Sequence, residues 1–471
     1  MLAAMPDSAP SPLSVGGPAL RDGGDACPGT LRLHRADDGA LARVRVPGGV
    51  LSADRADALL TAADRFGDGE LHLTSRGNVQ LRGLDTGCGG ALAELLAAAG
   101  LLPSAAHERA RNIVASPLAG LDGSPALGER LAELDRLVCA SPDAARLSGR
   151  FLFALDAGHG DVDALGADVT LIADGDDVLL RVGPGDEAFR VPAEAGPRAA
   201  LLAAEAFLRA AHGSGAWRVS DLPDAVRAEL VRSVAATAGP AVHRPRPRTA
   251  TPPAAGPYGP GGRSPYSLPV EGAAAGDPVT ATPAAPNSPP APVSATPLGP
   301  SPVPGGDITA ISVHVPLGRL TPAQWRLLAS TARRYGGELR LTPWRGIVVP
   351  GAFPRAEAAD ALRGLAAAGL ITSPGSPWTG VGACIGSPGC AKSLADVRAQ
   401  AGAAVGPVGR LPVYWSGCER RCGHPHGEWI DVVVTPDGHR ISHVRGERRD
   451  PPHTVRDDPE ARAAAVAAAR A

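Results

Sequence analysis

Four cysteines in the last quarter of the chain have the spacing of a metal–thiolate site. Five residues separate Cys384 from Cys390, and three separate Cys418 from Cys422. Four thiolates can bind either zinc or an iron–sulfur cluster. Zinc sites favour two to four residues within each cysteine pair. The five-residue gap therefore favours a loop around a bulkier [4Fe–4S] cluster, with zinc or unliganded thiols as the alternatives.

The remaining composition limits the class of protein. With 471 residues the chain is too long for one ordinary core, so two or more domains are expected. The other three cysteines are scattered, and no apolar stretch has the length of a targeting or membrane-spanning segment. The net charge of −2 gives no field that would recruit nucleic acid or membrane. These features predict a cytoplasmic, monomeric protein without nucleic-acid or membrane partners.

The elements that must position the cysteines occur twice in the chain. Residues 44–77 match residues 313–346, and each segment has the pattern of a strand, an amphipathic helix and a second strand. Ser52 is the predicted N-cap of the first helix, and Thr321 with Gln324 forms a capping box at the second. Residues 31–46 predict two strands joined by a turn, and the stretch 70–84 is predicted to form one strand.

The segments that follow each copy also correspond. Residues 111–120 resemble 382–391, and residues 153–182 resemble 415–444, but only the second set carries the cysteines. The sequence thus predicts a duplicated α+β protein in which one half specialises in holding a metal. A helix is expected to begin at Cys390 and end near residue 402, which would place a helix N-terminus against the thiolates.

Composition shifts place the boundaries between the predicted parts. These are a disordered N-terminus (1–25), a first half-domain (26–100), a first α/β domain (101–239), a Pro/Ala/Gly-rich linker (240–305), a second half-domain (306–375), a cysteine-bearing α/β domain (376–450) and a tail (451–471).

Together with the four cysteines, two arginine motifs carry a resemblance to a known family. Thr74, Arg76 and Gln80 form T-x-R-x-x-x-Q, and Arg111 precedes Asn112. The chain resembles the nitrite/sulfite reductase family over about residues 27–235 and 306–445. The resemblance implies two ferredoxin-like half-domains and two α/β units around a central pocket, with a [4Fe–4S] cluster and a bound tetrapyrrole.

Within that family, three segments are most similar to the oxygen-dependent monooxygenases of aerobic cobalamin synthesis: 107–120, 341–349 and 416–429. Those oxidoreductases hydroxylate precorrin-3A at C20 with formation of a γ-lactone. The resemblance implies a [4Fe–4S] cluster, a mononuclear non-haem iron, precorrin-3A and O2 as substrates, and an electron donor that is NADH-linked or ferredoxin-like.

The alternative activity is a sirohaem- and [4Fe–4S]-dependent reductase of nitrite or sulfite. Such reductases carry two lysines in a K-F-K segment, where this chain has Arg150, Phe151 and Leu152. Leu152 removes a cation that a site for a small oxyanion would use. A third possibility, a non-catalytic protein with a structural metal, would not require the arginine motifs.

The candidate site residues follow from the resemblance and from the charge of the ligand. A tetrapyrrole with several carboxylates requires guanidinium partners. The residues predicted to bind it are Thr74, Arg76, Gln80, Arg111 and Asn112, and the candidate catalytic residues are Arg76, Arg111 and Arg150.

Ligands for the non-haem iron are sought among the histidines. His424 and His426 follow Cys422 closely, and Glu428 comes next. Two histidines and one carboxylate form the usual ligand set of iron(II) that activates dioxygen. These three residues are the predicted iron ligands, with His72 and His443 as weaker candidates. The alternative is that the histidines line the pocket or are exposed.

Overall fold

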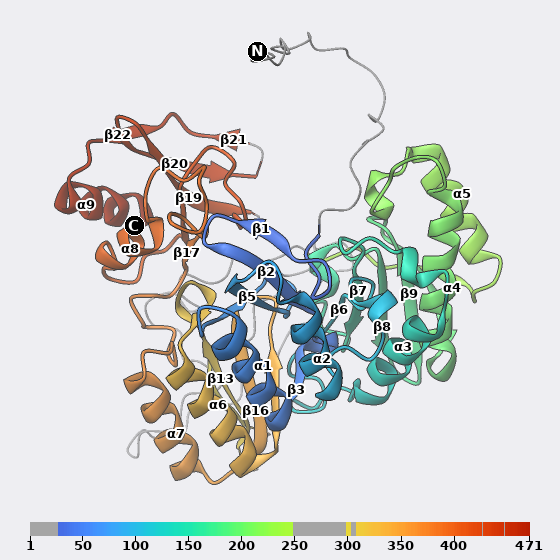
Figure 1. The fold of residues 1–471 in the computed structure, drawn as a ribbon. Coiled ribbons are helices and arrows are strands. Elements are labelled where there is room, and N and C mark those ends of the chain that lie inside the picture. The colour runs from blue at the N-terminus through green and yellow to red at the C-terminus, as the bar shows by residue number, and fades with distance from the viewer. Residues whose placement is uncertain (1–26, 248–297, 303–307, 426, 447) are drawn as a thin grey trace, which may run out of the picture.

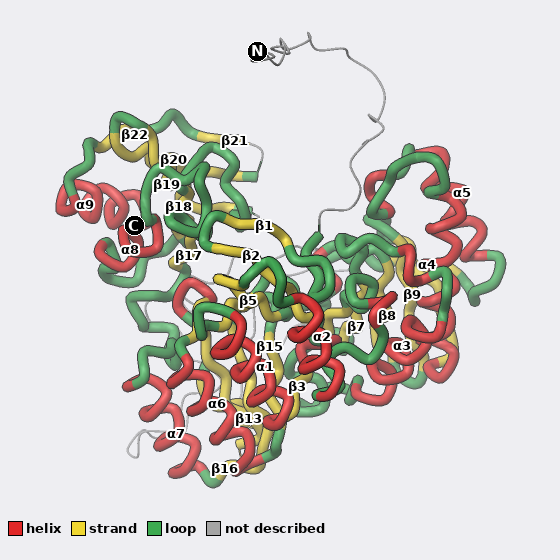
Figure 2. Tube along the Cα trace, in the orientation of Figure 1, coloured by secondary structure: helices red, strands yellow, loops and turns green. Residues whose placement is uncertain are grey.

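The structure is a computed structural model, and it describes residues 27–247, 298–302, 308–425, 427–446 and 448–471. The predicted disordered N-terminus and most of the predicted linker lie outside these residues. Figure 1 shows a central body made from the two half-domains, with one α/β unit on either side of it. Figure 2 shows that each of these parts contains both helices and strands, as an α+β fold requires.

The sheet of the first half-domain has the strand order β1-β2-β5-β4-β14, in which β14 (Arg319–Leu320) comes from the second half. Ser52 caps its long helix by accepting a hydrogen bond from the N–H of Arg55, as the sequence predicts. Its elements are β1 (His34–Ala36), β2 (Gly39–Val44), β3 (Val50–Ser52), α1 (Ala53–Phe66), β4 (Leu71–Leu73), β5 (Val79–Leu84) and α2 (Gly89–Ala98).

The second half-domain repeats this plan with the strand order β12-β13-β16-β15-β3. The predicted capping box of Thr321 and Gln324 is present at the start of its long helix. Its elements are β12 (Gly299–Pro302), β13 (Ile308–His314), β14 (Arg319–Leu320), α6 (Pro322–Tyr335), β15 (Glu338–Leu341), β16 (Gly346–Phe353) and α7 (Arg355–Ala367).

The two half-domains exchange strands. β3 of the first half pairs with β15, and β14 of the second half pairs with β4. Apolar residues of both halves form one shared core, and the buried Trp325 indole donates a 2.8 Å hydrogen bond to the carbonyl of Ala56 across it. Neither half can therefore bury its apolar face alone.

The two α/β units also share one topology. In each unit three parallel strands are followed by an antiparallel fourth, β6-β7-β8-β9 and β17-β18-β19-β20. The first unit contains β6 (Ile113–Ala115), α3 (Gly128–Ala140), β7 (Phe153–Asp156), β8 (Val169–Asp174), β9 (Asp177–Val182), β10 (Glu187–Pro192), α4 (Gly196–Ala210), α5 (Asp224–Ala235) and β11 (Ala241–His243). The second contains β17 (Val381–Ala383), α8 (Val397–Ala403), β18 (Val413–Ser416), β19 (Glu428–Thr435), β20 (Gly438–Arg445), β21 (Arg448–Arg449), β22 (His453–Val455) and α9 (Pro459–Arg470).

Within the half-domains and the linker, the structure differs from the sequence predictions at two places. The stretch 70–84 is a hairpin and not one strand, because the Thr74 hydroxyl accepts hydrogen bonds from the N–H groups of Arg76 and Asn78 and closes a turn. The predicted linker has strands at both ends, since β11 pairs with β10 and β12 pairs with β13.

A buried carboxyl pair beside β7 predicts a pH dependence of stability. Burial, and then the charge of Asp156, raise the pKa of Asp161 to about 7. This pKa lies above its unfolded value, so the protonated Asp161 carboxyl contributes to the free energy of unfolding. That contribution is complete below about pH 4 and is lost as the pH rises through about 7. We expect Asp161→Asn to flatten this part of the curve when unfolding in urea is measured between about pH 5 and pH 8. An unchanged slope would contradict the assignment.

Candidate functional site

The four cysteines lie at the carboxyl ends of two neighbouring parallel strands. Cys384 directly follows β17, and Cys418 follows β18 by two residues. The N–H of Cys384 donates to the carbonyl of Trp415, and the N–H of Gly417 donates to the Cys384 sulfur at 3.3 Å. Burial, and then the charges of Cys418 and Cys422, raise the pKa of the Cys384 thiol. The two cysteine pairs, distant in sequence, therefore converge on one site.

No three of the four cysteine sulfurs are as close together as the ligands of one zinc ion. All four cysteines are described, and no three of their sulfur atoms lie within 4.8 Å of one another. A tetrahedral zinc with bonds of about 2.3 Å would bring its ligands to roughly 4 Å apart. Soft thiolates on glycine-containing loops fit an iron–sulfur cluster, for which ligation by four cysteine thiolates is typical.

The helix predicted to start at Cys390 begins seven residues later. The helix α8 starts at Val397, where the Asp396 carboxylate caps it by accepting from the N–H groups of Arg398 and Ala399. Asp396 is the stronger N-cap, and the segment before it forms turns. That prediction is wrong, and no helix N-terminus stabilises the Cys390 thiolate.

The first half-domain holds the cysteine loop on both sides of Cys390. Arg82 is buried, pairs with both carboxylate oxygens of Asp38 at 2.8 Å, and donates to the carbonyl of Gly389 at 3.0 Å. The carboxylate of Asp37 accepts the N–H of Ala391. The turn between β1 and β2 thus fixes the backbone of the loop from outside the cysteine-bearing unit.

We expect Asp38→Asn to loosen this loop. The substitution leaves the Arg82 charge without its carboxylate and should lower the free energy of unfolding by about 1–3 kcal/mol, below the value for a fully buried pair because Asp38 is partly exposed. Chemical denaturation measures the loss, and Asp143→Asn, which removes an exposed ion pair, is the control. Equal stability of the two variants would show that the Asp38 pair does not hold the loop.

A first group of arginines surrounds the turn that carries the T-x-R motif. Arg76 donates to the carbonyl of Gly149 at 3.2 Å and is partly buried. Burial, and then the nearby charge of Arg218, lower the pKa of Arg76 to about 10. The charge of Arg43 also lowers this pKa, whereas that of Asp168 raises it. Arg218 pairs with the Asp168 carboxylate at 2.9 Å, whereas Arg76 donates to a carbonyl, so guanidinium groups outnumber carboxylates in this group, as in a site for an anionic ligand.

A second group of arginines lies beside the cysteine loop. Arg398 donates to the carbonyl of Cys384 at 3.2 Å. Burial lowers the pKa of Arg398 to about 10, with the charges of Arg345, Arg319 and Arg82 acting in the same direction. Arg345 stands in the second half-domain at the position that Arg76 has in the first. Sequence reasoning missed Arg43, Arg218, Arg319 and Arg398, because no motif contains them.

The other predicted tetrapyrrole-binding residues have structural partners. Arg111 is buried, forms two 2.7 Å bonds to the Asp135 carboxylate, and donates to the carbonyl of Leu101. The Asn112 side chain joins Asn78 and the carbonyl of Phe151. Thr74 shapes the turn that presents Arg76, and Gln80 is partly buried on β5. Their roles in ligand binding stay predictions.

The structure describes the candidate catalytic residue Arg150 and two of the three predicted iron ligands. Arg150 is exposed, and its guanidinium lies 4.5 Å from the centre of the Trp217 ring. His424 is exposed and stacks on Trp429. Glu428 lies 2.8 Å from His443. His426 lies outside the described residues, so the predicted His424–His426–Glu428 set stays a prediction.

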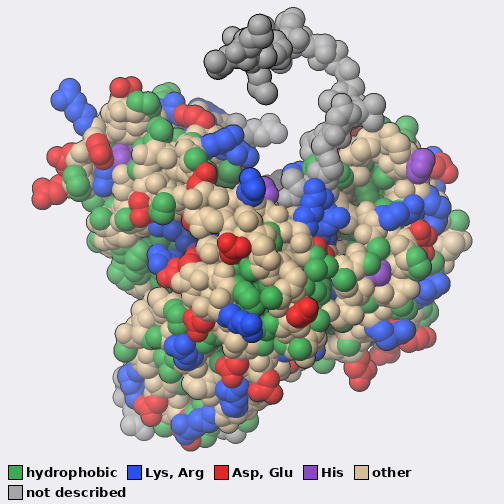
Figure 3. Space-filling view, in the orientation of Figure 1, with side chains coloured by type: hydrophobic (Ala, Val, Ile, Leu, Met, Phe, Trp, Pro, Cys, Tyr) green, Lys and Arg blue, Asp and Glu red, His purple; other side chains and the backbone are tan. Residues whose placement is uncertain are grey.

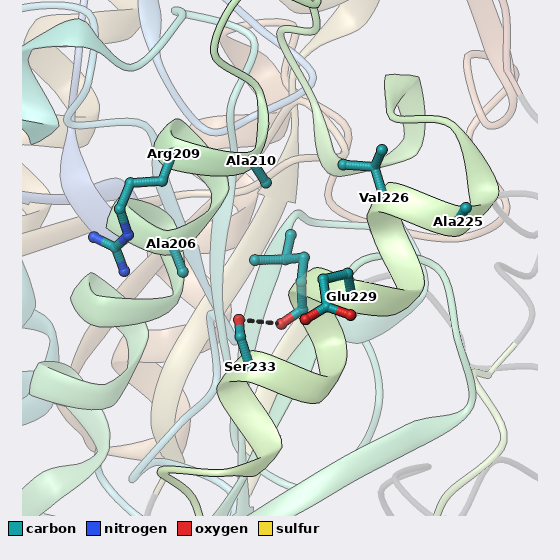
Figure 4. Close-up of a pocket in the computed structure, with 8 residues that line it drawn as sticks. Ala206, Arg209, Ala210, Ala225, Val226, Glu229 and Ser233 are labelled. Atoms are coloured by element: carbon teal, nitrogen blue, oxygen red, sulfur yellow. Dashed lines mark hydrogen bonds between the residues drawn. The ribbon is translucent and has the colours of Figure 1, made fainter.

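Two hollows lie away from the cysteines. A cavity of about 620 Å³ between α3 and β15 is lined by Ser116 and Ala119, on the loop that corresponds in the repeat to the cysteine loop. A groove of about 470 Å³ lies between α4 and α5 (Figure 4), where Ala206 and Ala210 of α4 lie opposite Val226 of α5 and the Ser233 hydroxyl donates to a carbonyl of its own helix. Arg111, Asp135, Cys139 and Glu338 also line the first of these hollows, but no three metal-ligand side chains of its described lining lie within 4.8 Å of one another.

The visible surface has basic and acidic side chains interspersed, without one dominant basic patch (Figure 3). Among the described residues, no helix is both long enough and apolar enough to cross a membrane.

Comparisons with known proteins agree with this geometry. The family described as "Nitrite/Sulfite reductase ferredoxin-like half domain" matches residues 33–99 and 302–368, which are the two copies of the repeat. A precorrin-3B synthase from Sinorhizobium sp is 26% identical over 449 residues, covering 92% of this chain and 85% of the relative.

Nitrite reductases match over shorter stretches. The chloroplastic ferredoxin–nitrite reductase of Zea mays is 32% identical over 25% of this chain and 22% of its own length, and that of Synechococcus elongatus is 38% identical over 18% of this chain and 17% of its own. The solved structure of the Mycobacterium tuberculosis NirA protein has a TM-score of 0.64 at 20% identity and covers 89% of this chain and 78% of its own. The chain therefore has the duplicated ferredoxin-like fold of the nitrite/sulfite reductases, and over most of its length it is similar to precorrin-3B synthase.

Proposed function

We propose that the chain is an oxidoreductase, precorrin-3B synthase, which uses O2 to hydroxylate precorrin-3A at C20 and forms a γ-lactone. The observation that carries the proposal is the pair of arginine groups around Arg76 and Arg398, the second of which adjoins the cysteines. Guanidinium groups held near one another are stabilised by an anion that contacts several of them. A tetrapyrrole with carboxylates around its rim is such an anion.

The cofactors enter as part of the same proposal. Cys384, Cys390, Cys418 and Cys422 would hold a [4Fe–4S] cluster, which supplies single electrons, while a mononuclear iron(II) supplies the reactivity toward dioxygen. This chain's own contribution is to orient the substrate: arginines bind the rim carboxylates, and the Asp38–Arg82 pair holds the cysteine loop in place. An NADH-linked or ferredoxin-like protein would deliver the electrons.

One position argues against reduction of nitrite or sulfite. Leu152, where such reductases are expected to have a cation, is buried in an apolar cluster with Val114, Ala154 and Trp344. Leu152 thus offers neither a charge nor a hydrogen bond, and a small oxyanion needs such partners.

The test is an anaerobic purification followed by one turnover. We expect iron and sulfide without a sirohaem absorption band, and conversion of precorrin-3A under isotopically labelled oxygen gas to a product heavier by one labelled oxygen. A sirohaem band together with nitrite reduction would replace the proposal by the reductase. Zinc alone would indicate a structural metal. Cluster-loaded protein with a supplied reductant that leaves precorrin-3A unchanged would overturn the synthase assignment.

A further inference from the structure

Three ligand-type side chains gather beside the cysteine loop on the edge of the first half-domain. Asp68 lies in the bend before β4, Glu70 directly precedes the strand, and His72 is its middle residue. One ligand atom from each lies within 4.8 Å of the other two. Among the described residues, this is the one group of three such side chains that meets this distance.

The buried imidazole points into this group. His72 is 7% exposed, and its Nε2 lies 3.8 Å from the Oδ2 of Asp68 without making a hydrogen bond. A buried polar atom that makes no hydrogen bond destabilises the fold. A divalent cation bound between Nε2 and the two carboxylates would satisfy this nitrogen.

We propose that Asp68, Glu70 and His72 form a mononuclear site for a divalent transition metal. An imidazole with two carboxylates suits first-row metals such as manganese(II) and iron(II), and three protein ligands leave positions open for small molecules. The site stands on these contacts alone. Its identification with the non-haem iron of the reaction rests on the proposed function.

An arginine already pairs with one of the carboxylates that the cation would bind. Arg319, on β14, pairs with both carboxylate oxygens of Glu70, and its side chain is 51% exposed. The pair is bidentate and the Glu70 side chain is only 18% exposed, so a metal must displace Arg319 to reach this carboxylate. Arg319 is thus a competitor of the metal, and its removal should strengthen metal binding.

Arg398 connects the site to the cysteines. Its Nη1 lies 3.5 Å from the Nδ1 of His72, and its Nε donates to the carbonyl of Cys384. A metal bound to the Nε2 of His72 places the ring proton on Nδ1, which then can no longer accept a hydrogen bond from Arg398. The hydrogen bond from Arg398 to the carbonyl of Cys384 remains. The metal would thus lie one arginine away from the cysteine loop and beside the second arginine group.

The internal repeat provides a matched control. Glu338 and Arg340 occupy the positions of Glu70 and His72 in the second half, and there the arginine pairs with its own glutamate at 2.7 Å and with the carbonyls of Pro117 and Ala119. This copy has the carboxylate but no imidazole, so it should not bind a metal.

Manganese(II) binding tests the site without relying on activity. Cluster-loaded protein is titrated with manganese(II), and the loss of the free-ion paramagnetic resonance signal counts bound metal. We expect one ion per chain, binding at least about tenfold weaker in Asp68→Asn and His72→Gln, unchanged in Glu338→Gln, and severalfold tighter in Arg319→Gln. Unaltered binding in both His72→Gln and Asp68→Asn would overturn the proposal, as would no binding by either the natural chain or Arg319→Gln.

The same preparations separate this proposal from the proposed function. Product formation from precorrin-3A that survives in His72→Gln, although metal binding is lost, would detach this metal from the reaction. Metal binding that follows the expected order in a chain that does not convert precorrin-3A would contradict the synthase assignment and leave the metal site standing.

Discussion

Cys418→Ser is expected to yield a folded protein that lacks its iron and sulfide. Serine preserves the shape of the loop, but its hydroxyl is a poor ligand for a soft metal centre, and Cys384, Cys390 and Cys422 cannot complete four thiolate bonds alone. Iron should fall from about four or five per chain to one or fewer, with loss of the charge-transfer absorption. Iron analysis and the visible spectrum of anaerobically prepared protein measure this.

Cys88→Ser is the matched control for this prediction. Cys88 precedes α2 in the first half-domain and belongs to neither cysteine pair. Its replacement should leave iron and sulfide unchanged. An intact cluster in Cys418→Ser, or an equal loss in Cys88→Ser, would show that the two cysteine pairs do not share one cluster.

Arg76→Gln is expected to weaken tetrapyrrole binding without destabilising the free protein. A hydrogen bond to a charged group contributes about 1.5–3 kcal/mol, which corresponds to roughly 10- to 150-fold in Kd. In the free chain, Arg76 is partly buried near Arg43 and Arg218, so removing its charge relieves repulsion. The thermal midpoint should therefore stay the same or rise while the affinity falls.

Titration with precorrin-3A in the absence of oxygen, followed by its absorption, measures the affinity. Arg146→Gln is the control, because Arg146 is exposed and pairs with Asp143 three residues away. A loss of stability in Arg76→Gln with unchanged affinity would assign Arg76 to the fold and not to the ligand.

The duplication explains why much of the architecture could be predicted from the chain. Strand–helix–strand periodicity and caps are local properties, so Ser52 and the box of Thr321 and Gln324 were predictable from neighbouring residues alone. The exchange of β3 and β14 between the half-domains could not be predicted, because strands of three and two residues are too short for their sequence to indicate which strand they pair with.

The candidate site divides in the same way. The sequence by itself predicts the ligand type, since four cysteines in a C-x5-C and C-x3-C order favour a soft metal centre. It also singled out Arg76 by its motif. It misplaced the start of the helix after Cys390, because the residues before Asp396 form turns and Asp396 caps the helix.

Only the tertiary structure decided what surrounds the four cysteines. Asp37, Asp38 and Arg82 hold the loop from roughly three hundred positions away in the chain, and Arg398 turns toward both Cys384 and His72. The physical reason is that the type of metal ligand depends on side chains and their spacing along the chain. The charged residues near a site depend instead on which surfaces pack together in the fold. The cysteines thus predict the metal centre, and the fold decides which charges and ligands stand beside it.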